Sequence, residues 1–188
     1  MEQTKKTIDN IIHANVMLQK FWSNANGWAP SNAASLMSKS RLDRQVSLSK
    51  ALHIWLERES LSEGELILAW ANLGALVEGT LKLFFSVYLN DYLQSGRIET
   101  DKNGFPKLPD IVSLEYLKVL MDKETRFEKH WSNFVGDVQK YRNAIHAYKD
   151  RELGDQGAFY SFVQKYYSFI KEVHSRLPYP DGYDFILH

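Results

Sequence analysis

The chain has 188 residues, enough for one domain with a substantial core, and its 23 basic residues (Lys and Arg) balance its 23 acidic residues. A formal charge of zero argues against a protein that coats nucleic acid along its whole surface, and the absence of cysteine excludes disulfides, thiol catalysis and thiolate metal sites. The N-terminus is polar and no uninterrupted apolar run approaches the roughly 18 residues of a membrane span, so we expect a cytoplasmic protein without a membrane partner.

Apolar residues recur at helical spacing through the N-terminal third of the chain, with breaks at Gly27 and Pro30. No long linker, internal repeat or low-complexity tract divides the sequence, so we expect an all-α helical bundle that forms a single domain over residues 1–188. In the N-terminal third the pattern predicts three helices, over residues 3–24, 31–40 and 45–58.

Ser62 and Glu65 have the spacing of a capping box, in which each side chain accepts a hydrogen bond from the other residue's backbone amide at a helix start. The helix that they open is expected to cover residues 62–95 and to be the longest in the chain. Because this segment is apolar on almost every side, it should lie at the centre of a bundle or pack on a partner subunit as well. Gly74 and Gly79 within it are expected to permit close helix packing rather than to bind phosphate.

Glu78 is a carboxylate inside this apolar helix. One interpretation is an exposed ion pair with Lys82 one helical turn later, which would stabilise the helix by about 0.2–0.5 kcal/mol. The other interpretation is a partly buried carboxylate that orients a cation from another helix. The i,i+4 spacing favours the exposed pair slightly over the buried carboxylate.

Polar and turn-forming residues interrupt the helical pattern over residues 96–109. Asn103-Gly104 in this segment favours either a small β-hairpin near residues 97–108 or a long polar loop. Apolar periodicity then returns and predicts three further helices, around residues 114–121 and over residues 125–150 and 156–176.

The segment Tyr141–Tyr148, near the end of the predicted helix 125–150, holds most of the chemistry-bearing residues of the chain. It places Arg142, Asn143 and His146 within five residues. An imidazole can transfer a proton near neutral pH, and a guanidinium can bind phosphate oxygens at two points. This pair is therefore suited to metal-free chemistry on a phosphodiester.

A continuous helix would make Arg142 and His146 neighbours on one edge, because they are four residues apart. Asn143 would point farthest from the core, toward a ligand or a second copy of the chain. Tyr148 would fall on the inward stripe, where core packing is more probable than stacking on a base. A purely structural interpretation also remains. In it Arg142 only neutralises Glu78, and basic residues occur here because the helix dipole favours cations near a helix C-terminus.

These residues resemble the hallmark of the HEPN superfamily of small helical-bundle proteins. In that family an Arg, usually followed by Asn, precedes a His near the end of a late helix, as Arg142, Asn143 and His146 do here. The following Ala147-Tyr148 resembles the His-x-Tyr ending of some toxin branches, and an earlier helix in the family often carries an acidic residue in an apolar setting, as Glu78 is here.

The resemblance covers roughly residues 62–176, which leaves residues 1–60 as an added helical region and residues 177–188 as a tail. The usual family spacing puts four to six residues between Arg and His, whereas this chain has three, and Ala147 occupies the commoner His position. Either His146 takes the family role from a different helical phase, or this protein binds without cleaving.

The resemblance implies a metal-independent endoribonuclease that acts as a homodimer in a toxin–antitoxin or phage-defence system, with an antitoxin or other protein as a further partner. In that picture His146 is the general acid or base, Arg142 stabilises charge on the phosphorane, Asn143 positions the phosphate or ribose, and Glu78 and Tyr148 support them. The local excess of basic over acidic residues between Lys123 and Arg151 is compatible with RNA. The alternatives are a non-catalytic HEPN-like module that binds a nucleotide, RNA or protein, and a helical scaffold.

No cofactor is expected. The six histidines lack any metal-binding spacing, and the chain has no phosphate-binding glycine loop, dinucleotide-binding glycine pattern or nucleophile elbow.

Overall fold

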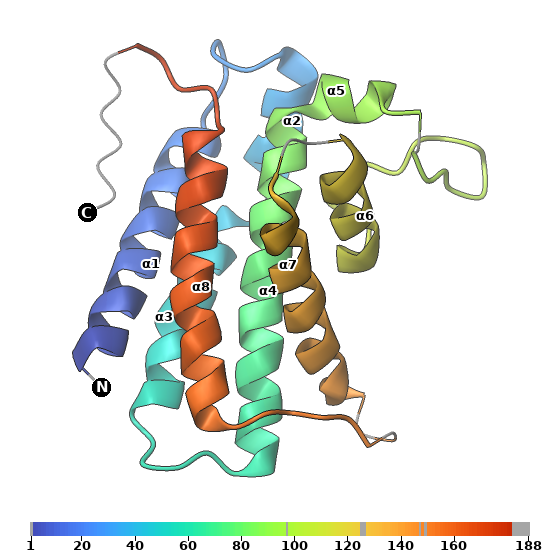
Figure 1. Cartoon of the computed structure of the whole chain (residues 1–188). Coiled ribbons are helices and arrows are strands. Elements are labelled where there is room, and N and C mark those ends of the chain that lie inside the picture. Colours follow the sequence, from blue (N-terminus) through green and yellow to red (C-terminus); the bar gives the residue numbers. More distant parts are fainter. Residues whose placement is uncertain (1, 97, 125–126, 147, 149, 182–188) are drawn as a thin grey trace.

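The structure is a computed structural model that describes residues 2–96, 98–124, 127–146, 148 and 150–181. These residues contain eight α-helices and one short 3₁₀-helix (Figure 1). No β-strand occurs within these ranges, so the prediction of an all-α bundle is confirmed. The helices are α1 (Glu2–Trp22), α2 (Ser31–Lys39), α3 (Leu42–Leu56), α4 (Glu63–Val87), α5 (Leu89–Gln94), α6 (Leu114–Glu124), α7 (Lys129–Arg142), η1 (Asn143–Ile145) and α8 (Gln156–Ser175).

Helix α4 is the central element, and α2, α3, α6, α7 and α8 all contact it. It begins with the predicted capping box: the Glu65 amide donates to Ser62 Oγ at 3.4 Å, and the Ser62 amide donates to Glu65 Oε2 at 2.9 Å. By length and composition alone α4 could span a bilayer, but 61% of its most apolar window is buried inside the bundle. A mostly buried apolar helix is what the core of a bundle requires.

The predicted helix 62–95 is wrong at its C-terminal end, because the chain leaves helical geometry at Tyr88 (φ −94°, ψ 38°) and α5 follows as a separate helix. Two tyrosine hydroxyls hold this bend. Tyr88 donates to the carbonyl of Arg176 beyond α8, and Tyr92 donates to the carbonyl of Lys107 at 2.6 Å. These contacts to distant segments redirect the chain, and the local apolar pattern cannot reveal them.

Residues 98–108 form a loop closed by an isolated antiparallel bridge between Thr100 and Pro106. The Asp101 amide donates to the Phe105 carbonyl at 2.8 Å, as in a hairpin, but the Asp101 carboxylate accepts from the amides of Asn103 and Phe105. Such side-chain bonds compete with a strand ladder. The polar-loop alternative therefore describes this segment better than the β-hairpin.

Candidate functional site

Helix α7 ends at Arg142, so the predicted single helix over residues 125–150 is wrong at both ends. Continuing the helix to residue 150 would extend α7 by about 12 Å along its axis. Instead the chain turns back: the Trp70 indole donates to the Leu153 carbonyl at 2.8 Å, and Tyr141 stacks on Trp70 with ring centroids 4.3 Å apart. These aromatic contacts with α4 fix where the helix stops.

The early stop gives each motif residue a different backbone setting. Arg142 closes α7, Asn143 opens η1, and His146 follows η1 with φ −84° and ψ 63°. The expectation that Arg142 and His146 are i,i+4 neighbours on a regular helix is therefore wrong. Ala147, at the commoner family position of the His, lies outside the described residues.

The structure nevertheless brings Arg142, Asn143 and His146 to one open groove of about 610 Å³. Helix α4 lines its floor, and the segment that leads into α6 lines the opposite wall. We call this the motif groove. Its remaining lining residues are Ala71, Ala75, Glu78, Lys82, Ile111, Val112, Ser113, Leu114, Glu115, Gln139 and Ile145.

Glu78 sits at the centre of an ion-pair cluster on α4. Its Oε1 lies 2.8 Å from Nζ of Lys82, and its Oε2 accepts a hydrogen bond from Nη1 of Arg142. The Glu78 side chain is only 17% exposed. The interpretation of Glu78 and Lys82 as an exposed ion pair is therefore wrong about the exposure of Glu78. The interpretation of Glu78 as a partly buried carboxylate that orients a cation from another helix is confirmed. Because two cations share one carboxylate, the cluster keeps one formal positive charge.

Arg142 is fixed along its stem as well as at its head. A Cβ on Gly74 would lie 2.5 Å from Cδ and 2.9 Å from Cβ of Arg142, distances that real side chains do not tolerate. Gly74 therefore permits the close approach of α7 to α4, as the sequence predicted. With its stem packed and one nitrogen bound to Glu78, the guanidinium presents its remaining donors from a fixed position.

His146 and Tyr148 are both exposed. Among the described residues no side chain hydrogen-bonds to the His146 imidazole, which leaves it open to a ligand in the groove. Tyr148 is fully exposed, so the expectation that it packs in the core is wrong. The inward stripe assumed a helix through residue 148, and the turn at η1 removes that helix.

The sequence does not identify several residues of the motif groove as site residues. Gln139 is three residues before Arg142 on the same helix, so its side chain shares that face and helical spacing could have found it. Ser113 lies just before α6 and Glu115 in its first turn, so both reach the groove through the tertiary placement of α6, which no local pattern marks. Within the described ranges no three His, Asp or Glu side chains gather to hold a metal ion.

No protein-family model, curated protein or solved structure matches this chain.

Proposed function

We propose that this protein is a HEPN-like, metal-independent endoribonuclease that works as a homodimer. The observation that carries the proposal is the convergence of Arg142, Asn143 and His146, the three residues of the family resemblance, on one open groove beside Glu78. An imidazole and a fixed guanidinium in one groove are the groups that phosphodiester transesterification requires without a metal.

In the proposed reaction His146 removes the proton from a ribose 2′-hydroxyl. The 2′-oxygen attacks the adjacent phosphorus, the bond from phosphorus to the 5′-oxygen breaks, and the leaving 5′-oxygen takes up a proton from water. Arg142 donates hydrogen bonds to the non-bridging oxygens, where negative charge develops, and Asn143 holds the phosphate or ribose. The products carry 2′,3′-cyclic phosphate and 5′-hydroxyl ends.

The ion-pair cluster supports this role for Arg142. Glu78 and Gly74 fix the guanidinium before a substrate arrives, so little side-chain entropy is lost when it binds phosphate. Lys82 shares the carboxylate and leaves the cluster with one net positive charge, which favours an anion.

The surface around the groove supports a homodimer. Ile111 and Ile145 are large apolar side chains with exposed fractions of 64% and 47%. Ile111 and Ile145 line the groove above a floor that includes Ala71 and Ala75, small residues that allow close approach of a second surface. Exposed apolar residues gathered at one place are typical of an interface between protein chains.

A non-catalytic HEPN-like binding module is the second candidate, and one observation favours it. A catalytic histidine is usually oriented by a third group, but no described residue hydrogen-bonds to the His146 imidazole. In this version Arg142 and Asn143 hold a nucleotide, RNA or protein ligand, and no bond breaks.

Incubation of RNA with purified protein in EDTA tests the proposal. We expect cleavage with cyclic phosphate ends, abolished in His146→Ala and retained in His13→Ala, a matched change of an exposed histidine on α1. Equal cleavage by wild type and His146→Ala would refute the role of His146. RNA binding without cleavage would support the binding module. The proposed cellular setting, a toxin–antitoxin or phage-defence system, rests on the family resemblance.

A further inference from the structure

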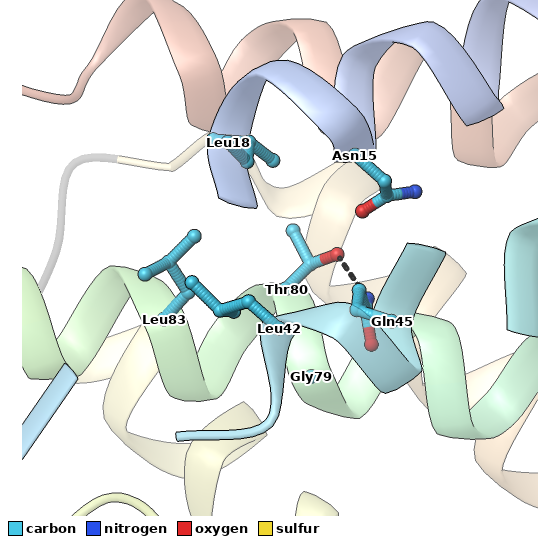
Figure 2. Close-up of a pocket in the computed structure, with 7 residues that line it drawn as sticks. All are labelled: Asn15, Leu18, Leu42, Gln45, Gly79, Thr80 and Leu83. Atoms are coloured by element: carbon cyan, nitrogen blue, oxygen red, sulfur yellow. Dashed lines mark hydrogen bonds between the residues drawn. The ribbon is translucent and has the colours of Figure 1, made fainter. Parts of the chain in front are cut away.

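A second hollow of about 350 Å³ lies beside the motif groove, between α4 and the turn that joins α2 to α3. Lys39 is the last residue of α2 and Arg41 lies in that turn, and Lys82 and Ser86 come from α4. We call it the cationic hollow. Its deep end adjoins a small buried space that Figure 2 displays, and the two share Leu42, Gln45, Gly79 and Leu83.

The cationic hollow is more positive than the chain as a whole, whose formal charge is zero. Lys39, Arg41 and Lys82 line it, and Asp110 is the single acidic residue among its described lining residues. Arg41 also pairs with Asp43, which lies outside the lining, at 2.6 Å between Nη2 and Oδ2. Because solvent screens this exposed pair, an incoming anion can compete for the guanidinium.

The packing of α3 on α4 holds Arg41 at the cationic hollow. Gln45, one helical turn after Arg41 on α3, donates from Nε2 to the Leu76 carbonyl at 2.7 Å. It also donates to Thr80 Oγ1 at 3.4 Å (Figure 2). A Cβ on Gly79 would lie 2.2 Å from Gln45 Oε1, so the glycine leaves room for the Gln45 amide to lie against α4. The start of α3, with the positive end of its dipole, is thereby fixed against α4.

The cationic hollow continues the motif groove along α4. Lys82 lines both, and the neighbouring positions Glu78 and Gly79 line one each. Ala71 at the far end of the motif groove and Ser86 in the hollow are separated by about 22 Å of helix. A chain-like polyanion can therefore follow one continuous path along α4. On this path it would pass a positively charged side chain of the motif groove and another of the cationic hollow.

We propose that the cationic hollow is a second phosphate-binding subsite, for the same single-stranded RNA whose reacting phosphate lies in the motif groove. This inference rests on the proposed function. Lys39 and Arg41 bind a phosphate away from the reacting one, and Lys82 lies between the two subsites. RNA long enough to reach both subsites therefore binds more tightly than RNA that fills only the motif groove.

The test compares a trinucleotide with a twelve-residue single strand, both of 2′-O-methyl RNA, which lacks the attacking hydroxyl. The Lys39→Ala/Arg41→Ala variant should lose on the order of tenfold in the ratio of long-strand to trinucleotide affinity at 0.1 M salt. The slope of log affinity against log salt should fall by about 0.7 for the one phosphate contact that is lost. Lys20→Ala/Lys50→Ala, with the same charge change at two exposed lysines, should keep the wild-type ratio and slope.

Three results would overturn the inference, and they differ in what they say of the proposed function. If the two double variants behave alike while wild type cleaves RNA, only the second subsite is refuted. Equal loss of trinucleotide and long-strand binding in Lys39→Ala/Arg41→Ala would mean that these cations serve the motif groove and form no separate subsite. If wild type binds neither strand, both the subsite and the proposed function are refuted. A variant with Arg41→Lys alone keeps the charge and should keep the salt slope.

Discussion

Arg142, the last residue of α7, donates a hydrogen bond from Nη1 to Oε2 of Glu78 in the middle of α4. This bond joins the end of the motif helix to the centre of the bundle. The same guanidinium lines the motif groove, so one side chain has a structural role and is also available to a ligand. Measurements of stability and of RNA cleavage separate the two roles.

Replacing Arg142 by Ala should lower the free energy of unfolding by about 1–3 kcal/mol, because Glu78 loses one of its two cations in a mostly buried position. Guanidinium chloride unfolding at pH 7 measures the change. Lys140→Ala, which removes an exposed and solvent-screened ion pair with Glu152, should lower the free energy of unfolding less than Arg142→Ala does. An unchanged unfolding midpoint in Arg142→Ala would contradict a structural role for the pair.

Gly74→Ala should destabilise the protein even though Ala is the better helix former by about 1 kcal/mol. The new Cβ would lie 2.9 Å from Cβ of Arg142, an atom fixed to the backbone, so α7 must move at a cost of about 1–3 kcal/mol. Gly64→Ala is the matched control, because nothing lies within 4 Å of a Cβ there. It should be neutral or stabilising in the same unfolding experiment. Equal stability of the two variants would contradict tight packing of α7 on α4.

The local sequence pattern predicts where the helices lie. It does not predict a helix end that is set by contacts between residues distant in sequence. Spacing and capping sufficed for α1, α2 and the start of α4, where the signal lies within one turn. The ends of α4 and α7 depend on Tyr88 and Trp70, which bond to carbonyls far along the chain. No periodicity encodes such contacts.

The candidate site depends in the same way on contacts between distant residues. Arg142, Asn143 and His146 were identified from residue chemistry and do line one groove, because they are near in sequence whatever the backbone does. Their directions were predicted from an ideal helix, so the placement of Tyr148 failed once α7 stopped early. The opposite wall, with Ser113 and Glu115, comes from a separate segment and needed the tertiary fold.

Acid should destabilise the protein through His174, which is 4% exposed. Burial lowers the pKa of its imidazole to about 4, from the ordinary value of 6.5. Tyr179 packs on the ring, with centroids 5.1 Å apart. Between these two pKa values the unfolded chain binds the proton and the folded chain does not, so stability is lost as the pH falls through this window.

Unfolding at pH 7 and pH 4.5 measures this contribution. Wild type should lose about 2–3 kcal/mol more than His174→Phe over this interval, since the variant keeps a ring and has no proton to bind. Comparing the two proteins removes the effect of other groups that titrate in both. The same loss in wild type and variant would mean that His174 does not resist protonation.

Ile145→Asp should disrupt the proposed homodimer, because it places a carboxylate in the exposed apolar rim of the motif groove. Light scattering after size exclusion at tens of micromolar should give a dimer for wild type and a monomer for the variant. Ile54→Asp changes a residue of nearly equal exposure on α3, 49% against 47%, and should remain dimeric. A monomeric wild type would contradict the dimer directly.

Tyr148→Ala should weaken RNA binding without changing the fold. Its side chain is fully exposed, two residues after His146 in the chain, so no core packing is lost. Stacking of one base on an aromatic ring contributes about 1–3 kcal/mol. We therefore expect affinity for an uncleavable single strand to fall by at least about fivefold in Tyr148→Ala and to be kept in Tyr148→Phe, with equal melting temperatures for all three proteins. A lower melting temperature in Tyr148→Ala would instead indicate that the ring packs on the protein, and equal affinity would remove Tyr148 from the RNA-binding surface.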